Sequence, residues 1–282
     1  MANKIFLSQR SLRHVVKRLD ASYAYDASFG VWQTLKIDNT GLNFPWMIAT
    51  DGTYIYVCDG NNQRIVKLTT ALTWVASLDV STTIGRPHAI MYDGVSSLYV
   101  AGIDVYRTIS IGKIDVGTFL VTKNNLNIYA ADSNDQPMGI SKGFVAGTFL
   151  ISGMVDLLNV TESGTFSTAV PQSIAGEVGS RFYGNVMHTD GNLYLNKKNN
   201  LGSFIEKVNS SYINVGDSDR ISKASIYVFQ GLSSSFLVYD NYNRKIIRYD
   251  QYMNYVEDVY TDTGTTIQLD AEDICGIIEM AV

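Results

Sequence analysis

The stretch Ile65-Val66-Lys67-Leu68-Thr69 decides the fold, because the same five-residue pattern recurs along the chain. An aliphatic residue comes first, a basic residue usually stands third, an apolar residue fourth, and Asp, Asn or Thr last. The spacings between successive copies are 49, 46, 46, 48 and 41 residues, and 52 through the two termini. This regularity predicts a chain of six repeats. The copies begin at Val16, Ile65, Ile111, Leu157, Ile205 and Ile246.

Each repeat contains further strand signals on both sides of this pattern. Upstream lies a short run of β-branched and aromatic residues, such as residues 55–57 or 236–238, which predicts a strand buried on both faces. A weaker strand follows, for example residues 74–78. A further column of apolar residues precedes the buried run, so each repeat predicts four antiparallel strands. This column is centred on Ile48, Ile90, Ile140, Val186, Ile226 and Ile277.

Four-stranded repeats of this length, without helical periodicity, predict an all-β fold, a six-bladed β-propeller in a single domain of residues 1–282. A β-sandwich or a β-solenoid is the alternative. A sandwich does not explain matching strand columns, and solenoid repeats are usually shorter. The predicted blades span residues 44–79, 86–122, 136–170, 181–216 and 222–260, and a split blade combines 272–282 with 3–31.

The split blade follows from the two ends of the chain. Residues 5–7 match the second strand of the other repeats, whereas residues 274–280 match the first. We therefore expect one C-terminal and three N-terminal strands to close the last blade. The basic residues Arg13, Lys17 and Arg18 then belong to turn and strand positions, although a basic start without acids also resembles a transit peptide.

Two repeats share a longer pattern of residues. One consists of Pro45 to Ile48, Tyr56-Val57-Cys58-Asp59 and Asn62-Gln63-Arg64-Ile65-Val66-Lys67, and the other begins with residues 240–246. Both resemble the NHL-type repeat. Residues 102–110 and 196–204 depart from the Asp/Asn/Arg turn of that family. The resemblance implies a propeller that serves as a binding or scaffold domain, because enzymes are a minority among such propellers.

Composition narrows the classes of partner. Charged residues make up 17% of the 282 residues and the formal net charge is −5, so we expect no nucleic-acid partner. No apolar run reaches the length of a membrane helix, and residues 1–19 lack the apolar segment of a signal peptide. Cys58 and Cys275 are the only cysteines, and whether they pair is left open.

The strand columns predicted to line the channel contain few metal ligands. Among 24 such positions Asp273 is the only carboxylate, and Asn185 and Gln136 are the only amides. A calcium site needs several oxygen ligands, so we expect no metal, no cofactor and no enzyme of the lactonase type. His88, beside Arg86 and near Asp273, is either a general base or a structural hydrogen-bonding group at a blade junction, and we favour the structural role.

The function predicted from these observations is a non-enzymatic, rigid module for interaction or assembly. Made in the cytoplasm without a signal peptide, it would suit a virion component such as a phage tail, baseplate or capsid-associated protein. The alternatives are a metal-dependent lactonase or esterase and a carbohydrate-binding propeller that stacks sugars on Trp46, Tyr106, Tyr183 or Tyr242.

The partner is expected on the face that carries the loops entering the first strands and leaving the second strands. This face is rich in the Tyr, Trp and Arg residues that dominate interface hot spots. The expected contact residues are Trp46, Arg86, His88, Tyr106, Arg107, Arg181, Tyr183 and Tyr242.

Overall fold

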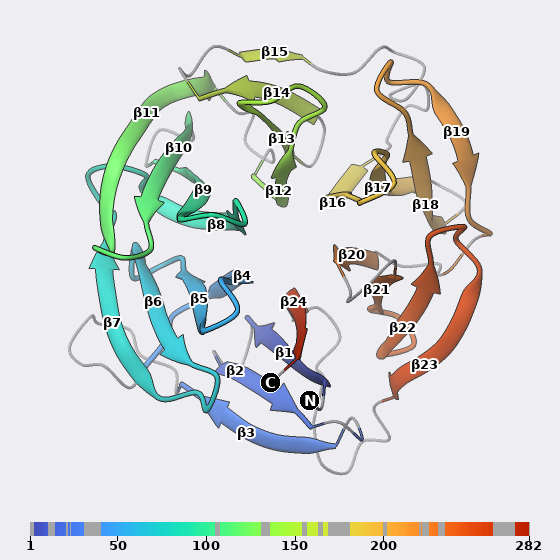
Figure 1. Ribbon diagram of the computed structural model, residues 1–282, viewed down its shortest axis with the longest axis horizontal. Coiled ribbons are helices and arrows are strands. Elements are labelled where there is room, and N and C mark those ends of the chain that lie inside the picture. The colour runs from blue at the N-terminus through green and yellow to red at the C-terminus, as the bar shows by residue number, and fades with distance from the viewer. Residues whose placement is uncertain are drawn as a thin grey trace. The chain divides into compact units, whose positions relative to one another are not determined.

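The computed structural model describes most of the chain as strands and tight turns. The described residues are 3–10, 15–20, 22, 24–30, 41–104, 108–130, 136–153, 157–162, 166–168, 181–199, 202–219, 221, 226–230, 235–261 and 274–281. They form six antiparallel four-stranded sheets (Figure 1). The fold class is therefore all-β, a six-bladed β-propeller, as the repeats predict.

Contacts along the chain divide it into two compact units, Met1–Ala130 with Thr263–Val282, and Ala131–Asp262. Each unit contains three of the sheets. We call them the first unit and the second unit and describe each by itself.

The first unit holds the split sheet and the next two sheets along the chain. The split sheet has the order β24-β1-β2-β3, with β24 Ile274–Ala281, β1 Asn3–Gln9, β2 Val15–Leu19 and β3 Tyr25–Phe29. The second sheet is β4 Pro45–Thr50, β5 Tyr54–Asp59, β6 Arg64–Thr69 and β7 Trp74–Asp79. The third is β8 Arg86–Tyr92, β9 Ser97–Ile103, β10 Thr108–Asp115 and β11 Leu120–Ala130.

The second unit repeats the same order in three consecutive sheets. Its sheets are β12 Gly139–Lys142, β13 Thr148–Ser152, β14 Leu157–Thr161 and β15 Phe166–Thr168; β16 Arg181–Met187, β17 Leu193–Asn199, β18 Gly202–Val208 and β19 Asn214–Asp217; and β20 Ile226–Gln230, β21 Ser235–Asp240, β22 Lys245–Asp250 and β23 Tyr255–Thr261.

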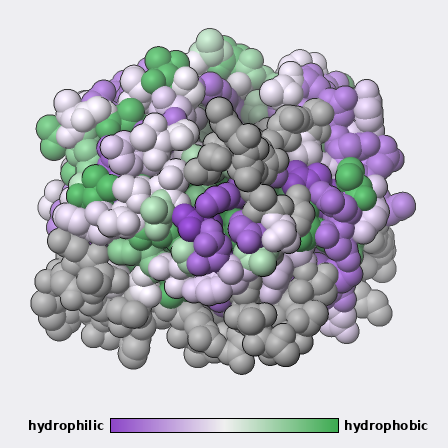
Figure 2. Space-filling model, turned by 60° about the horizontal axis from the view of Figure 1, so that its bottom comes forward, coloured by the Kyte–Doolittle hydropathy of each residue, from purple (hydrophilic) through white to green (hydrophobic). Residues whose placement is uncertain are grey.

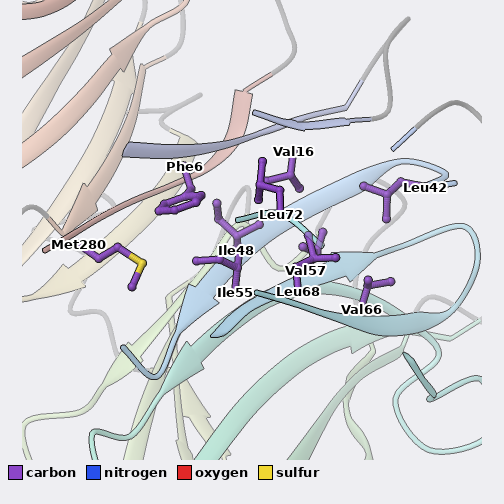
Figure 3. Close-up of a cluster of buried hydrophobic side chains, with 10 residues drawn as sticks. All are labelled: Phe6, Val16, Leu42, Ile48, Ile55, Val57, Val66, Leu68, Leu72 and Met280. Carbon is purple, nitrogen blue, oxygen red and sulfur yellow. The ribbon is translucent and has the colours of Figure 1, made fainter. Parts of the chain in front are cut away.

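The pairing of β24 with β1 confirms the split blade. These antiparallel strands match Leu7 with Ile277 and Lys4 with Met280. The two ends of the chain are thus joined by backbone hydrogen bonds and by side-chain burial, without a connecting turn. Phe6 and Met280 enter one hydrophobic cluster with Ile48 and Val57 of the neighbouring sheet (Figure 3).

Burial explains why the strand signals differ in strength. In β9 every residue is buried, which accounts for the continuous apolar run of a second strand. In β7 partly buried and exposed residues alternate, because only one face of this fourth strand is covered. The fourth strands therefore carry the weaker signal.

The repeated basic position of the third strand joins neighbouring sheets in the first unit. Arg18 donates to the carbonyl of Thr70 (2.6 Å), and the Lys67 ammonium lies 3.4 Å from the carbonyl of Val116. In each case the acceptor is the first residue after the third strand of the next sheet. In these two sheets the third residue of the pattern thus fastens one sheet to the next, whereas Arg248 bonds to Glu257 and Ser235 of its own sheet.

Candidate functional site

Three side chains from three consecutive sheets of the first unit meet around Trp46. The rings of Trp46 on β4 and His88 on β8 are stacked, with centroids 4.3 Å apart and planes inclined by 22°. The Arg10 guanidinium, which follows β1, lies 4.4 Å from the Trp46 ring centroid. Strand β4 packs beside both β1 and β8, which brings these residues together (Figure 1). We call this group the Trp46 stack.

Burial keeps the His88 imidazole uncharged. The side chain is only 3% exposed, and loss of solvation lowers its pKa from 6.5 to about 3, with further lowering by the charges of Arg10 and Arg86. A neutral imidazole carries one N–H donor and one acceptor nitrogen. His88 Nδ1 has no hydrogen-bond partner in the part of the chain that the structure describes.

The turn between β5 and β6 is built against the Trp46 stack. A Cβ atom at Gly60 would lie 2.6 Å from Cδ1 of Trp46, so this position has no room for a side chain. The preceding residue, Asp59, is fully buried and accepts hydrogen bonds from Asn62 Nδ2 (2.8 Å) and Arg64 Nε (2.7 Å). Burial raises the pKa of Asp59, and these bonds oppose the rise.

A second copy of this turn joins β21 and β22 in the second unit. Asp240 accepts bonds from the backbone N–H of Tyr242 (3.0 Å) and from Asn243 Nδ2 (2.6 Å). Gln63 and Arg244 hold the same left-handed position in the two turns, with φ of 53° and 54°. The two stretches that resemble each other in sequence therefore share one local structure.

The sheet β16–β19 replaces this arrangement with a buried ion pair. Lys197 on β17 holds the repeat position that Asp59 and Asp240 hold in the other two sheets, and its ammonium is 3.5 Å from Glu206 Oε2 on β18. Both residues are buried, and loss of solvation raises the pKa of Glu206 although Lys197 opposes the rise. The departure of residues 196–204 from the repeat pattern thus has a structural cause.

The expected contact residues fall into four groups. Trp46 and His88 are buried at 7% and 3% exposure, whereas Arg86 is exposed, as is Tyr242 at 67%. Tyr106, Arg107 and Asp273 lie outside the described residues, so the His88–Asp273 pairing stays a prediction. Arg181 and Tyr183 are placed on β16 by their backbone, and their side chains lie outside the description. On the face shown in Figure 2, hydrophilic residues are interspersed with small hydrophobic groups.

Asn185, one of the residues predicted to line the channel, forms hydrogen bonds with neighbouring strands of the second unit. Its Nδ2 donates to Ser141 Oγ (2.7 Å) and to the carbonyl of Leu150 (3.0 Å), and its Oδ1 accepts from Ser152 Oγ (3.1 Å). This amide joins the sheets β12–β15 and β16–β19. It therefore holds neighbouring blades together.

Sequence reasoning missed Arg10 and Gly60. Arg10 carries no local signal of a site, because its contact is with Trp46 of another repeat. The signal available for Gly60 was weak, since other repeats carry different residues at this turn position, as Asn241 shows.

Among the described residues no three His, Cys, Asp or Glu side chains are grouped to hold a metal ion. Within the same residues no helix has the length and apolar character needed to cross a bilayer. Cys58 and Cys275 are both buried and are not joined by a disulfide, and burial raises the pKa of the Cys58 thiol.

Comparison with known proteins shows the fold alone. No family model matches the chain, and no curated protein matches it. Among solved structures, a protein of unknown function from Bacteroides caccae is similar, with a TM-score of 0.74, 8% identity and full coverage of both chains. A chain in the crystal structure of a nidogen/laminin complex is similar too, with a TM-score of 0.67, 12% identity and 99% of each chain covered.

Proposed function

We propose that this propeller is a non-enzymatic, rigid module that binds another protein in an assembly, with a phage virion as the setting that its composition suggests. In that setting the chain is made in the cytoplasm and incorporated into the particle. An NHL-type ancestry belongs to the same proposal. The shared Asp/Asn turns at Asp59 and Asp240 support it.

Tyr242 is the observation that carries this proposal. Its side chain is 67% exposed, although its turn is held by the Asp240 carboxylate and by Asn243. A large aromatic side chain on a backbone that is already ordered loses little entropy on docking, which is the property of a binding hot spot. The nidogen/laminin structure, which is itself a complex, is consistent with protein binding by this fold.

The same sheet offers a matched control. Tyr252 is 69% exposed and lies in the turn between β22 and β23, whereas Tyr242 lies between β21 and β22. Successive turns of an antiparallel sheet lie at opposite ends of its strands. The two tyrosines are therefore about equally exposed, but they lie at opposite ends of one blade.

The test is association of the Tyr242→Ala and Tyr252→Ala variants with the assembly that co-purifies with the wild-type protein. We expect Tyr242→Ala to weaken association at least about tenfold, which corresponds to roughly 1.4 kcal/mol, and Tyr252→Ala to leave it within about twofold. Full retention by Tyr242→Ala, with an unchanged melting temperature, would refute the role of this turn. Saturable glycan binding that Tyr242→Ala abolishes would instead assign the tyrosine to sugar stacking.

A further inference from the structure

The Trp46 stack gathers positively charged and N–H-bearing groups in one corner of the first unit. Arg10 and His88 both contact the Trp46 ring, at 4.4 Å and 4.3 Å from its centroid. Arg86 stands at the start of β8, the strand that carries His88. Its side chain is exposed and Arg10 is partly exposed, so solvent reaches both cations while His88 lies beneath the surface.

Two atoms of this corner lack the partners that buried polar groups require. Arg10 Nε and His88 Nδ1 are both buried, and neither has a hydrogen-bond partner among the described residues. Native proteins pair the great majority of such atoms, with protein, water or a bound group. Arg10 Nε is a donor, and the neutral imidazole can place its proton on Nδ1. Both atoms can therefore be satisfied by a hydrogen-bond acceptor.

The charges around these atoms select the kind of acceptor. Neither Arg10 nor Arg86 forms an ion pair with a carboxylate within the described ranges, unlike Arg18, Arg64 and Arg248. A guanidinium presents a planar set of N–H donors that matches the two oxygens of a carboxylate. Two guanidinium groups and a neutral imidazole therefore form a donor set for an anionic oxygen group.

We propose that Arg10, Arg86 and His88 form a binding site for a carboxylate group, which sits beside the Trp46 ring. The carboxylate belongs either to a small free anion or to an acidic side chain of a protein partner, and both share the same recognising chemistry. This site does not depend on Tyr242, which lies in the other unit. Loss of binding at Tyr242 and loss of binding here are separate outcomes.

The test is a titration of the full-length, ¹⁵N-labelled protein followed at the indole N–H signals of its three tryptophans. The Trp46 signal is assigned with Trp46→Phe. We expect sodium acetate to shift this signal saturably and the Trp74 signal to stay in place, because Trp74 belongs to β7. Acetamide, which is neutral, and sodium chloride at equal concentration are expected to produce no saturable shift.

Variants then assign the effect to the named groups. Arg10→Gln and Arg86→Gln should each weaken acetate binding at least about tenfold, since each removes a charged donor. His88→Phe keeps a ring against Trp46 and should weaken binding by a similar factor. Arg244→Gln is the control, because Arg244 is an exposed arginine in the other unit. Unchanged binding in the first three variants with folded spectra, or an equal chloride response, would overturn the proposal.

A blocked aspartate, N-acetyl-aspartyl amide, distinguishes the two sources of the carboxylate. Tighter binding of this compound than of acetate supports an acidic side chain of a partner. Equal or weaker binding supports a small free anion. If neither compound shifts the Trp46 signal saturably, the corner is a packing arrangement and the proposal fails.

Discussion

The imidazole of His88 lies flat against the indole of Trp46, with ring centroids 4.3 Å apart and an interplanar angle of 22°. The two rings come from the first strands of neighbouring sheets. This contact buries a titratable group in a place where protonation is opposed by low solvation and by two arginines. It therefore makes stability depend on pH in a way that can be measured.

His88→Phe should remove part of the acid sensitivity of the fold. The unfolded chain binds a proton at His88 below pH 6.5, whereas the folded chain resists it down to about pH 3, so the free energy of unfolding falls as the pH falls through this window. Because the pKa of His88 falls from 6.5 to about 3 on folding, this effect can change the free energy of unfolding by at most roughly 5 kcal/mol. Urea unfolding at pH 4, 5, 6 and 7 should show a shallower decline for His88→Phe. Parallel profiles for the two proteins would contradict the burial of a neutral His88.

Gly60→Ala should destabilise the protein and disturb the Trp46 stack. The added Cβ would lie 2.6 Å from Trp46 Cδ1 and 2.9 Å from its Nε1, so the indole must move. Overpacking of this kind costs about 1–3 kcal/mol. The control is Gly117→Ala, whose nearest contact would be Asp115 Oδ1 at an ordinary 3.4 Å. Thermal unfolding should separate the two variants, and equal melting temperatures would count against a tight contact at Gly60.

Asp59→Asn should be more costly than Asp240→Asn, although both residues begin the same turn. Asp59 forms a buried ion pair with Arg64 at 2.7 Å, and its loss leaves the guanidinium without that carboxylate. Breaking a buried pair costs about 3–5 kcal/mol. Asp240 instead accepts from the uncharged N–H groups of Tyr242 and Asn243, and the amide oxygen of an Asn side chain can still accept a hydrogen bond there. Denaturant unfolding gives both values. A smaller loss for Asp59→Asn than for Asp240→Asn would show that the ion pair is not the main support of this turn.

Removal of β24 should abolish cooperative unfolding. A chain ending at residue 273 loses the partner of β1 and the Met280 side chain from the cluster with Phe6 and Ile48. The exposed edge of β1 then becomes a template for association between chains. Calorimetry and light scattering should report a broad transition and aggregation. A monomer with the wild-type melting temperature would mean that β24 does not complete this blade.

The strand architecture was predictable because its signals are local. Residue alternation, the repeated basic third position and the spacing of the six copies depend on neighbours within one repeat, so they indicated four strands per blade and the division of the last blade between the two termini. The Asp turns at Asp59 and Asp240 were visible for the same reason, since both lie within one hairpin.

The tertiary structure alone decided which side chains meet across blades. Trp and His are residue types that suit an exposed contact surface, but the packing of β4 beside β8 buries both Trp46 and His88. Arg10, which follows β1, contacts the Trp46 ring from a third sheet. Tyr242 has the same residue type as the fully buried Tyr56, and only its place at a turn leaves it exposed. The physical reason is that strand formation depends on a chain's immediate neighbours. Burial, and the pKa that follows from it, depend on segments that the sequence places far apart and the sheets bring together.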